Sequence, residues 1–342
     1  MPTLKETGTP SKNDKLIEKV TRNLQERSEK SLEIAKEKIL SETVECKEIN
    51  EAFRHYAEIW YDYIHPGLVS IACEAVGGDP ERAVPMQVVM LLLSAACDLH
   101  DDVIDESKMK YGKPTVFGKF GKDITLLVGD AFMMKALALL HKLEKEFAAE
   151  KMNMMWNIIS SRFFELGDAE ALEVSLKGSV NISPEMCFGI IEKKASSFEA
   201  NMRIGAIIGG AETSLVDMLG NYGKTIGILL GVRDEFIDIF EPDELQNRVK
   251  NELPPLPILY TICACKSSRT KKVIIDILSR SKISDQDAEK IVDIVYEEET
   301  VKKFINRIQS LAEKTLNNIS TLQNKNVRSQ MQTLILSLLE DL

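Results

Sequence analysis

The stretch Cys97-Asp98-Leu99-His100-Asp101-Asp102-Val103-Ile104-Asp105 carries the most information about this chain. It contains no glycine and follows an apolar run, residues 88–97, which together predict a helix. Asp101 and Asp105 are four residues apart and share one helix face, so their like charges repel unless a cation lies between them. Carboxylate oxygens suit Mg²⁺, which typically uses one or two carboxylates together with substrate phosphates. The alternative is a solvated acidic face, which the preceding apolar run disfavours.

A second acidic cluster follows another apolar helix in residues 227–238, with the sequence GILLGVRDEFID. Asp234 and Asp238 lie one turn apart, as Asp101 and Asp105 do. Two acidic clusters at the ends of two central helices could face each other across a bundle and hold several Mg²⁺ ions around a diphosphate. One acidic triplet is weak evidence for such a site, whereas two with apolar leads are strong evidence.

The amino-acid composition limits the kinds of partner and cellular location that we expect for this protein. The net charge of −10 disfavours nucleic acid and anionic membranes as partners. No run of 18 uninterrupted apolar residues occurs and the N-terminus is polar, so we expect no transmembrane segment and no signal peptide. The 6 cysteines are scattered through apolar contexts, which is typical of reduced thiols in a cytoplasmic protein.

Helical patterns predominate along the chain, and strand signals are almost absent. Residues 1–14 predict a disordered tail, and residues 15–342 a single all-α domain of about ten or more helices. Prolines mark the expected helix boundaries, at positions 66, 80, 85, 114, 184, 242, 254, 255 and 257. Four segments are apolar nearly all round and are expected at the centre of the bundle: 87–99, 124–140, 202–208 and 225–232.

Together these motifs resemble the trans-isoprenyl diphosphate synthase, or polyprenyl synthetase, family. Residues 101–105 resemble its first aspartate-rich motif, and residues 234–238 resemble the second. Gly112-Lys113-Pro114-Thr115, Gly129-Asp130 and Gly77-Gly78-Asp79-Pro80 match further family signatures. The resemblance implies a class I isoprenoid synthase fold, in which an all-α bundle surrounds a central cavity. It also implies a homodimer.

The same resemblance implies roles for individual residues around an allylic diphosphate. About three Mg²⁺ ions would be held by Asp101, Asp102, Asp105, Asp234, Glu235 and Asp238. The catalytic residues would be Asp101, Asp105, Asp234 and Lys194, and the cations that bind substrate Lys110, Lys113 and Lys194. The family's loop lysine falls at Leu253, so Arg248 and Lys250 are candidate substitutes.

Departures from the family pattern are concentrated on the side that binds isopentenyl diphosphate. Asp62 and His65 stand at the family's lysine and arginine positions, and Ser94 stands at a usual histidine. Tyr111 replaces the second arginine of a pair whose first member is Lys110, on the allylic side. A negative charge and lost cations would weaken isopentenyl diphosphate binding. The sequence therefore predicts Mg²⁺-dependent ionisation of a long allylic diphosphate without isopentenyl addition, as in a prenyltransferase-like terpene synthase.

Two alternatives stay open at this stage. The chain could be a chain-elongating trans-polyprenyl diphosphate synthase, making geranylgeranyl or longer products, or a non-catalytic subunit of a heteromeric synthase. The small residues Ala96 and Cys97, just before the first motif, predict a deep tunnel that binds a C20 or longer tail, although ordinary core packing would also explain them.

Overall fold

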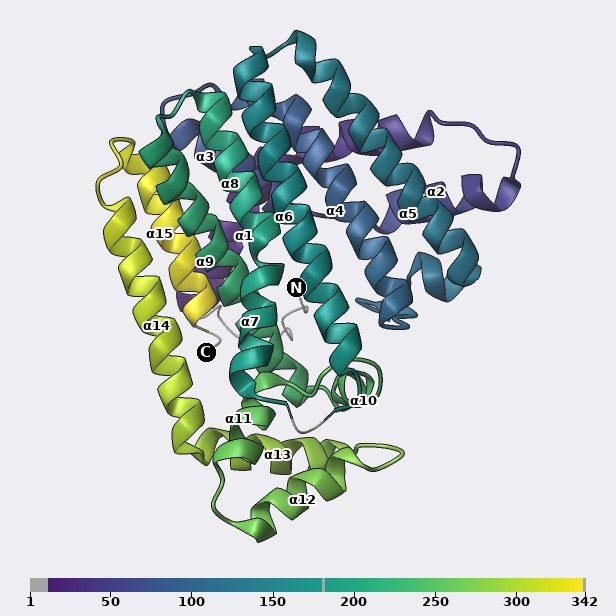
Figure 1. Ribbon diagram of the computed structural model, residues 1–342, viewed down its shortest axis with the longest axis vertical. Helices are drawn as coiled ribbons and strands as arrows, with labels where there is room; N and C mark the ends of the chain where they lie inside the picture. The colour runs from purple at the N-terminus through teal and green to yellow at the C-terminus, as the bar shows by residue number, and fades with distance from the viewer. Residues whose placement is uncertain (1–11, 180–181, 341–342) are drawn as a thin grey trace. The chain divides into compact units, whose positions relative to one another are not determined.

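The computed structural model describes residues 12–179 and 182–340, and most of these residues are α-helical (Figure 1). The predicted all-α class is confirmed. Helices α1 to α15 span, in order, Lys12–Leu40, Lys47–Ile59, Ile64–Ala75, Val84–Ile104, Val116–Lys142, Ala149–Leu176, Pro184–Lys194, Ser196–Gly209, Thr213–Ile237, Pro242–Asn251, Leu256–Ala264, Ser268–Leu278, Asp285–Glu297, Glu299–Ile319 and Lys325–Leu339. Single 3₁₀ turns are η1 (Pro80–Ala83), η2 (Leu143–Lys145) and η3 (Asp238–Phe240), and two short strands are β1 (Met109–Lys110) and β2 (Lys113–Pro114).

The described residues form two compact units. The first unit runs up to Ser160 and adds Ala200–Gly220 and Leu322–Thr333. The second unit consists of Ser161–Glu199, Asn221–Thr321 and the residues from Leu334 onward. Most of the predicted N-terminal tail, residues 1–11, lies outside the described residues, and α1 begins at Lys12. The single domain expected for residues 15–342 stays a prediction.

Helix α4 lies at the centre of the first unit and packs against α1, α3 and α5; Figure 1 shows α4 and α5 side by side. Pro85 occupies its first turn, where a missing backbone N–H costs nothing. Its side chains are buried on nearly every face, and Met86, Leu91 and Leu92 are fully buried. Burying each such side chain contributes roughly 1.5–3 kcal/mol, so the unit's core holds α4 and the acidic residues at its end in place.

The hairpin of β1 and β2 was not expected from the sequence. Lys110 pairs with Lys113 across a two-residue turn made by Tyr111 and Gly112, whose φ angles are 52° and 74°. Turns of this kind need positive φ at both central residues. Glycine adopts that conformation readily, but tyrosine does so rarely, which is why the sequence pattern concealed the turn.

Helix α11 lies at the centre of the lower part of the second unit and packs against α7, α13 and α14, as Figure 1 shows. Pro184 and Pro242 stand in the first turns of α7 and α10, which confirms the predicted helix starts. Ser284 and Asp287 form a capping box at the start of α13. These caps fix the helices that flank the second acidic motif.

Two helical stretches among the described residues are long and apolar enough to cross a membrane by length and composition alone. They are Pro80–Ile104, whose apolar window is 67% buried, and Val116–Lys145, whose window is 33% buried. Core helices of water-soluble proteins have the same composition, so the expected lack of a membrane span stays a prediction.

Candidate active site

The first acidic motif lies at the C-terminal end of α4. Asp101 and Asp102 are in the last helical turn, and Asp105 is the C-cap residue. The backbone N–H of Asp105 donates to the Asp101 carbonyl oxygen over 2.9 Å, so the two residues are one turn apart as predicted. A helix C-terminus carries partial negative charge, which adds to that of the carboxylates. This end of the helix therefore favours a cation strongly.

Lys110 supplies one such cation from the hairpin. Its Nζ atom lies 2.8 Å from Oδ1 of Asp98 and 2.8 Å from Oδ1 of Asp102. Burial raises the pKa of Asp102 to about 7, although Lys110 lowers it. Burial disfavours the charge of Lys110, but Asp98 and Asp102 outweigh it and raise the lysine pKa. Lys110 thus lies at the first motif, as expected, but it pairs with carboxylates that belong to the motif and its helix.

The Gly-Lys-Pro-Thr segment joins this loop to α5. The Thr115 hydroxyl group caps α5 by accepting from the Gly118 N–H at 2.9 Å, and donates to the Ser107 carbonyl oxygen at 2.7 Å. A Cβ atom on Gly118 would lie 2.1 Å from the Lys108 carbonyl oxygen, so this close approach requires glycine. Lys113, in the same segment, is exposed to solvent.

The Gly129-Asp130 pair lets α4 and α5 approach each other next to the motif. Nε2 of His100 lies 3.3 Å from Oδ1 of Asp130. A Cβ atom on Gly129 would lie 2.6 Å from that same Nε2 atom. Glycine at this position therefore gives His100 the room to reach across to α5.

The positions expected to bind isopentenyl diphosphate form a compact polar cluster in the first unit. Nδ1 of His65 lies 2.8 Å from Oδ2 of Asp62, and the Ser94 hydroxyl group donates to the same oxygen at 3.3 Å. The side chains of Asp62 and His65 are only 14% and 16% exposed. Nearby, the rings of Tyr61 and Tyr111 lie 5.5 Å apart, and burial raises the pKa of Tyr61 to about 12. An ion pair and the phenol of Tyr111 thus lie at the positions where the family resemblance predicts cations.

The second acidic motif lies at the C-terminal end of α9 in the second unit. Asp234 and Glu235 are in the last turn, and Asp238 begins η3. Arg248 reaches this motif from α10, with Nη2 2.6 Å from Oε1 of Glu235 and Nη1 2.7 Å from Oδ2 of Asp238. Its Nε atom lies 2.9 Å from Oε2 of Glu252. Burial raises the pKa of Asp238 to about 7, although Arg248 lowers it.

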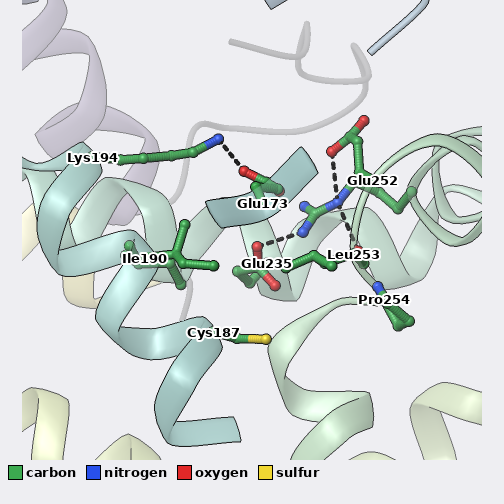
Figure 2. Close-up of a pocket in the computed structure, with 10 residues that line it drawn as sticks. Glu173, Cys187, Ile190, Lys194, Glu235, Glu252, Leu253 and Pro254 are labelled. Atoms are coloured by element: carbon green, nitrogen blue, oxygen red, sulfur yellow. Dashed lines mark hydrogen bonds and ion pairs between the residues drawn. The ribbon is translucent and has the colours of Figure 1, made fainter. Parts of the chain in front are cut away.

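A cavity of about 90 Å³ lies beside Arg248 in the second unit (Figure 2). Figure 2 shows Glu235 between Ile190 and Leu253, and Lys194 reaching toward Glu173. Nζ of Lys194 lies 2.5 Å from Oε2 of Glu173 and 3.1 Å from Oε1 of Glu170. A cavity of this size has room for only a few water molecules, so we expect a diphosphate to enter it only if these ion pairs open.

The carboxylates of the two acidic motifs differ in how available they are to coordinate a metal ion. The first motif offers three carboxylates, of which Lys110 contacts that of Asp102, and this oxygen donor set suits a hard divalent ion. Among the described residues, no group of three or more histidine, cysteine, aspartate or glutamate side chains is arranged to hold a metal ion by itself. A metal here would therefore complete its coordination with phosphate and water. At the second motif, Arg248 already contacts two of the three carboxylates.

The predicted residues thus fall into separate groups. Asp101, Asp102, Asp105 and Lys110 lie together in the first unit, and Asp234, Glu235, Asp238 and Arg248 lie together in the second. That the two groups face each other stays a prediction.

The remaining predicted residues differ in their exposure. Ala96 is fully buried in α4 and Cys97 is half-buried, while Lys250 is exposed on α10.

Sequence reasoning missed Asp98, Glu173 and Glu252 as partners of the site's cations. Of these three partners, only Glu252 could have been predicted from the sequence. It lies four residues after Arg248, a spacing at which opposite charges pair on a helix. Asp98 lies 12 residues before Lys110, and Glu173 lies 21 residues before Lys194. No local sequence pattern predicts contacts over such separations.

Comparison with known proteins agrees with the resemblance to the polyprenyl synthetase family. A model of the polyprenyl synthetase family matches residues 46–295. The geranylgeranyl diphosphate synthase of Methanosarcina mazei is 26% identical over 72% of this chain and 75% of its own length. The corresponding enzyme of Sulfolobus acidocaldarius is 24% identical over 75% of this chain and 77% of its own length.

Solved structures give the same fold. The crystal structure of a geranylgeranyl pyrophosphate synthetase from Pyrococcus horikoshii matches with a TM-score of 0.84 and 22% identity, covering 95% of this chain and 99% of that one. A polyprenyl synthase from Caulobacter crescentus, complexed with calcium and isoprenyl diphosphate, matches with a TM-score of 0.76 and 16% identity over 97% and 99% of the two chains. Because the family model matches most of this chain's length, the chain belongs to the polyprenyl synthetase family of prenyltransferase enzymes.

Proposed function

We propose that this enzyme is a Mg²⁺-dependent, chain-elongating trans-prenyl diphosphate synthase that makes geranylgeranyl or longer products. The observation that carries this proposal is an acidic residue at all six positions of the two motifs within a polyprenyl synthetase domain. Curated relatives named as geranylgeranyl diphosphate synthases support it. The sequence alone favoured ionisation without elongation, and these relatives favour the elongating alternative.

We assign the binding of the metal ions and the binding of the diphosphate to different residues. Asp101 and Asp105, with Asp234 from the second motif, would hold Mg²⁺, of which we propose three ions. When bound, Mg²⁺ supplies charge that stabilises the departing diphosphate. Lys110 and Lys194 would donate hydrogen bonds to the allylic diphosphate, exchanging their carboxylate partners for phosphate oxygens.

The proposal includes a homodimer in the cytoplasm. The exposed apolar surface of α5, where Leu127 is 55% and Met134 is 63% exposed, supports the dimer. Large apolar side chains grouped on one helix are common at interfaces between protein chains.

A specific observation favours a second candidate function. The part-buried Asp62–His65 pair lies at the positions where we expect isopentenyl diphosphate to need cations. An enzyme that lacks these cations could ionise an allylic diphosphate and release its prenyl group as a hydrocarbon or an alcohol, as prenyltransferase-like terpene synthases do.

One experiment separates the candidates. Purified protein is incubated with Mg²⁺ and allylic diphosphates of C10 to C25, and released inorganic diphosphate is measured with and without isopentenyl diphosphate. Release that requires isopentenyl diphosphate supports elongation. Release that is independent of it supports the terpene synthase interpretation, and no release under any condition indicates a non-catalytic subunit.

A further inference from the structure

Asp98 contacts the amine of Lys110 from outside the first acidic motif. It lies on α4 four residues before Asp102, so the two carboxylates share one helix face and their like charges repel. Nζ of Lys110 lies 2.8 Å from Oδ1 of each carboxylate and compensates both charges. Asp98 belongs to neither acidic motif, so the proposed metal ligands do not account for its charge.

Asp98 is itself held by a tyrosine of α2. The Tyr56 hydroxyl group donates to Oδ2 of Asp98 at 3.3 Å, whereas Lys110 approaches Oδ1. Tyr56 is 5% exposed, and its ring centroid lies 5.4 Å from that of Trp60 and 5.2 Å from that of Phe132. Burial raises the pKa of Tyr56, so the phenol keeps its proton and stays a donor. The carboxylate of Asp98 therefore meets Lys110 from a fixed place.

The two carboxylate partners of Lys110 differ in what can replace the lysine. The side chain of Asp102 is 3% exposed and lies next to Asp101, so a cation that binds at the motif with the diphosphate would compensate its charge. Asp98 lies one turn earlier on the helix, and its side chain is 45% exposed. An ammonium group has three N–H donors, so Lys110 can turn toward phosphate oxygens while one donor stays with Asp98.

We propose that Asp98 is a positioning residue, which holds the Lys110 amine at the first motif so that its other N–H groups donate to the diphosphate of the allylic substrate. The inference rests on the proposed function, in which Lys110 binds that diphosphate. A lysine side chain loses rotamer freedom when it is fixed, and Asp98 fixes it before the substrate arrives. Lys110 thus exchanges Asp102, and not Asp98, for phosphate oxygens.

The sign of the effect separates positioning from a general effect of charge. Like charges repel, so the loss of a carboxylate near an anionic ligand should by itself tighten the binding of a diphosphate. The loss of a positioning residue should weaken that binding. In Asp98→Asn we expect Kd to rise by about tenfold, which is the order of the rotamer entropy of one lysine side chain. Asp98→Glu retains the charge and should restore most of the binding.

A double-mutant cycle tests the inference without turnover. The full-length protein is titrated with farnesyl S-thiolodiphosphate, an unreactive allylic analogue, in the presence of Mg²⁺, and Kd is measured by calorimetry. In the Lys110→Gln background, Asp98→Asn should no longer weaken binding, because a residue that acts through Lys110 then has nothing to position. Tyr56→Phe should weaken binding less than Asp98→Asn does, and only while Lys110 is present.

Glu81→Gln is the matched control, because it removes the carboxylate of an exposed pair with Lys30 in η1, at the opposite end of α4 from the motif. It should leave Kd unchanged. The inference is overturned if Asp98→Asn binds the analogue as tightly as the unchanged protein, or if its effect persists in the Lys110→Gln background. The Tyr56→Phe arm decides in the same way if Asp98→Asn fails to fold.

A separate assay of prenyl transfer distinguishes this inference from the proposed function. The expected binding cycle in a protein that transfers no prenyl group would reject the proposed function and leave the role of Asp98 standing. Prenyl transfer together with an unchanged Kd in Asp98→Asn would reject only the role of Asp98. Failure of the unchanged protein to bind the analogue would overturn both.

Discussion

Nδ1 of His65 lies 2.8 Å from Oδ2 of Asp62, so a part-buried ion pair occupies the positions where the family resemblance predicts a lysine and an arginine. Burial alone would raise the pKa of Asp62, but His65 lowers it. Burial alone would lower the pKa of His65, but Asp62 raises it. Each partner thus stabilises the other's charge, and the pair as a whole offers a diphosphate no net positive charge.

Restoring the two cations should improve the binding of isopentenyl diphosphate. In the double variant Asp62→Lys/His65→Arg, we expect the KM for isopentenyl diphosphate to fall by about tenfold or more. Hydrogen bonds to charged groups contribute roughly 1.5–3 kcal/mol each, and about 1.4 kcal/mol corresponds to a factor of ten. Asp123→Lys, a charge change at an exposed position of α5, is the control. An unchanged KM in the double variant would show that this cluster does not face the substrate.

The same ion pair should make stability depend on pH. The His65 pKa lies above its ordinary 6.5 in the folded protein, so its contribution is complete below pH 6.5 and is lost as pH rises through the raised value. The Asp62 pKa lies below its ordinary 3.8, so its contribution is complete above that value and is lost in acid. The pair therefore stabilises most between these limits.

His65→Gln tests this pH dependence. Urea unfolding should show the variant destabilised by about 3 kcal/mol at pH 6, because the part-buried Asp62 loses its partner. The difference from the unchanged protein should shrink as pH rises above the raised His65 pKa. A difference that stays constant from pH 6 to pH 9 would argue against a charged His65.

Removing either key carboxylate should abolish turnover. We expect Asp101→Asn and Asp234→Asn each to lower kcat by at least about 100-fold, because each would leave part of the metal–diphosphate charge without its ligand. Asp123→Asn should stay within twofold of the unchanged enzyme, since Asp123 is exposed on α5. Activity that survives in Asp101→Asn would refute the metal assignment.

A bulky side chain at Ala96, just before the first motif, should shorten the product. Ala96 is fully buried in α4, and we expect Ala96→Phe to shift the chain length downward by at least one five-carbon unit. The substitution should also cost roughly 1–3 kcal/mol through overpacking, so unfolding is measured alongside. Ala148→Phe, at an exposed position, is the control. An unchanged product distribution in folded Ala96→Phe would place Ala96 in ordinary core packing.

The close approach of α4 and α5 should depend on Gly129. In Gly129→Ala the new methyl group would lie 2.6 Å from Nε2 of His100, and we expect a loss of roughly 1–3 kcal/mol in the free energy of unfolding. Gly189→Ala in α7 meets nothing within 4 Å and should instead stabilise by about 0.5–1 kcal/mol. Equal effects of the two changes would mean that the His100 contact is unimportant.

Local signals in the sequence predicted much of the fold. Pro85, Pro184 and Pro242 lie in first turns, where proline costs least, so the helix starts were readable from sequence. The four-residue spacing in the first acidic motif likewise predicted that Asp101 and Asp105 lie one helical turn apart. Such features depend on neighbours within one or two turns, which is the range that a single sequence records.

Contacts between distant residues could not be predicted in this way. Arg248 contacts Glu235 across 13 residues and a change of helix, and the family resemblance indicated it only as a candidate substitute for a missing lysine. Lys110 reaches Asp98 and Asp102 because Tyr111 adopts a positive φ in the hairpin turn. Both contacts depend on how loops return to the helix ends, which composition and spacing do not determine.

Joining isopentenyl diphosphate to an allylic diphosphate is the reaction on which the proposed function depends. It is tested by supplying Mg²⁺, farnesyl diphosphate and radiolabelled isopentenyl diphosphate, and separating the products by chain length. We expect label in a diphosphate of twenty or more carbons. An unlabelled hydrocarbon or alcohol, formed while the labelled substrate remains untouched, would show instead that the enzyme ionises its substrate without elongating it.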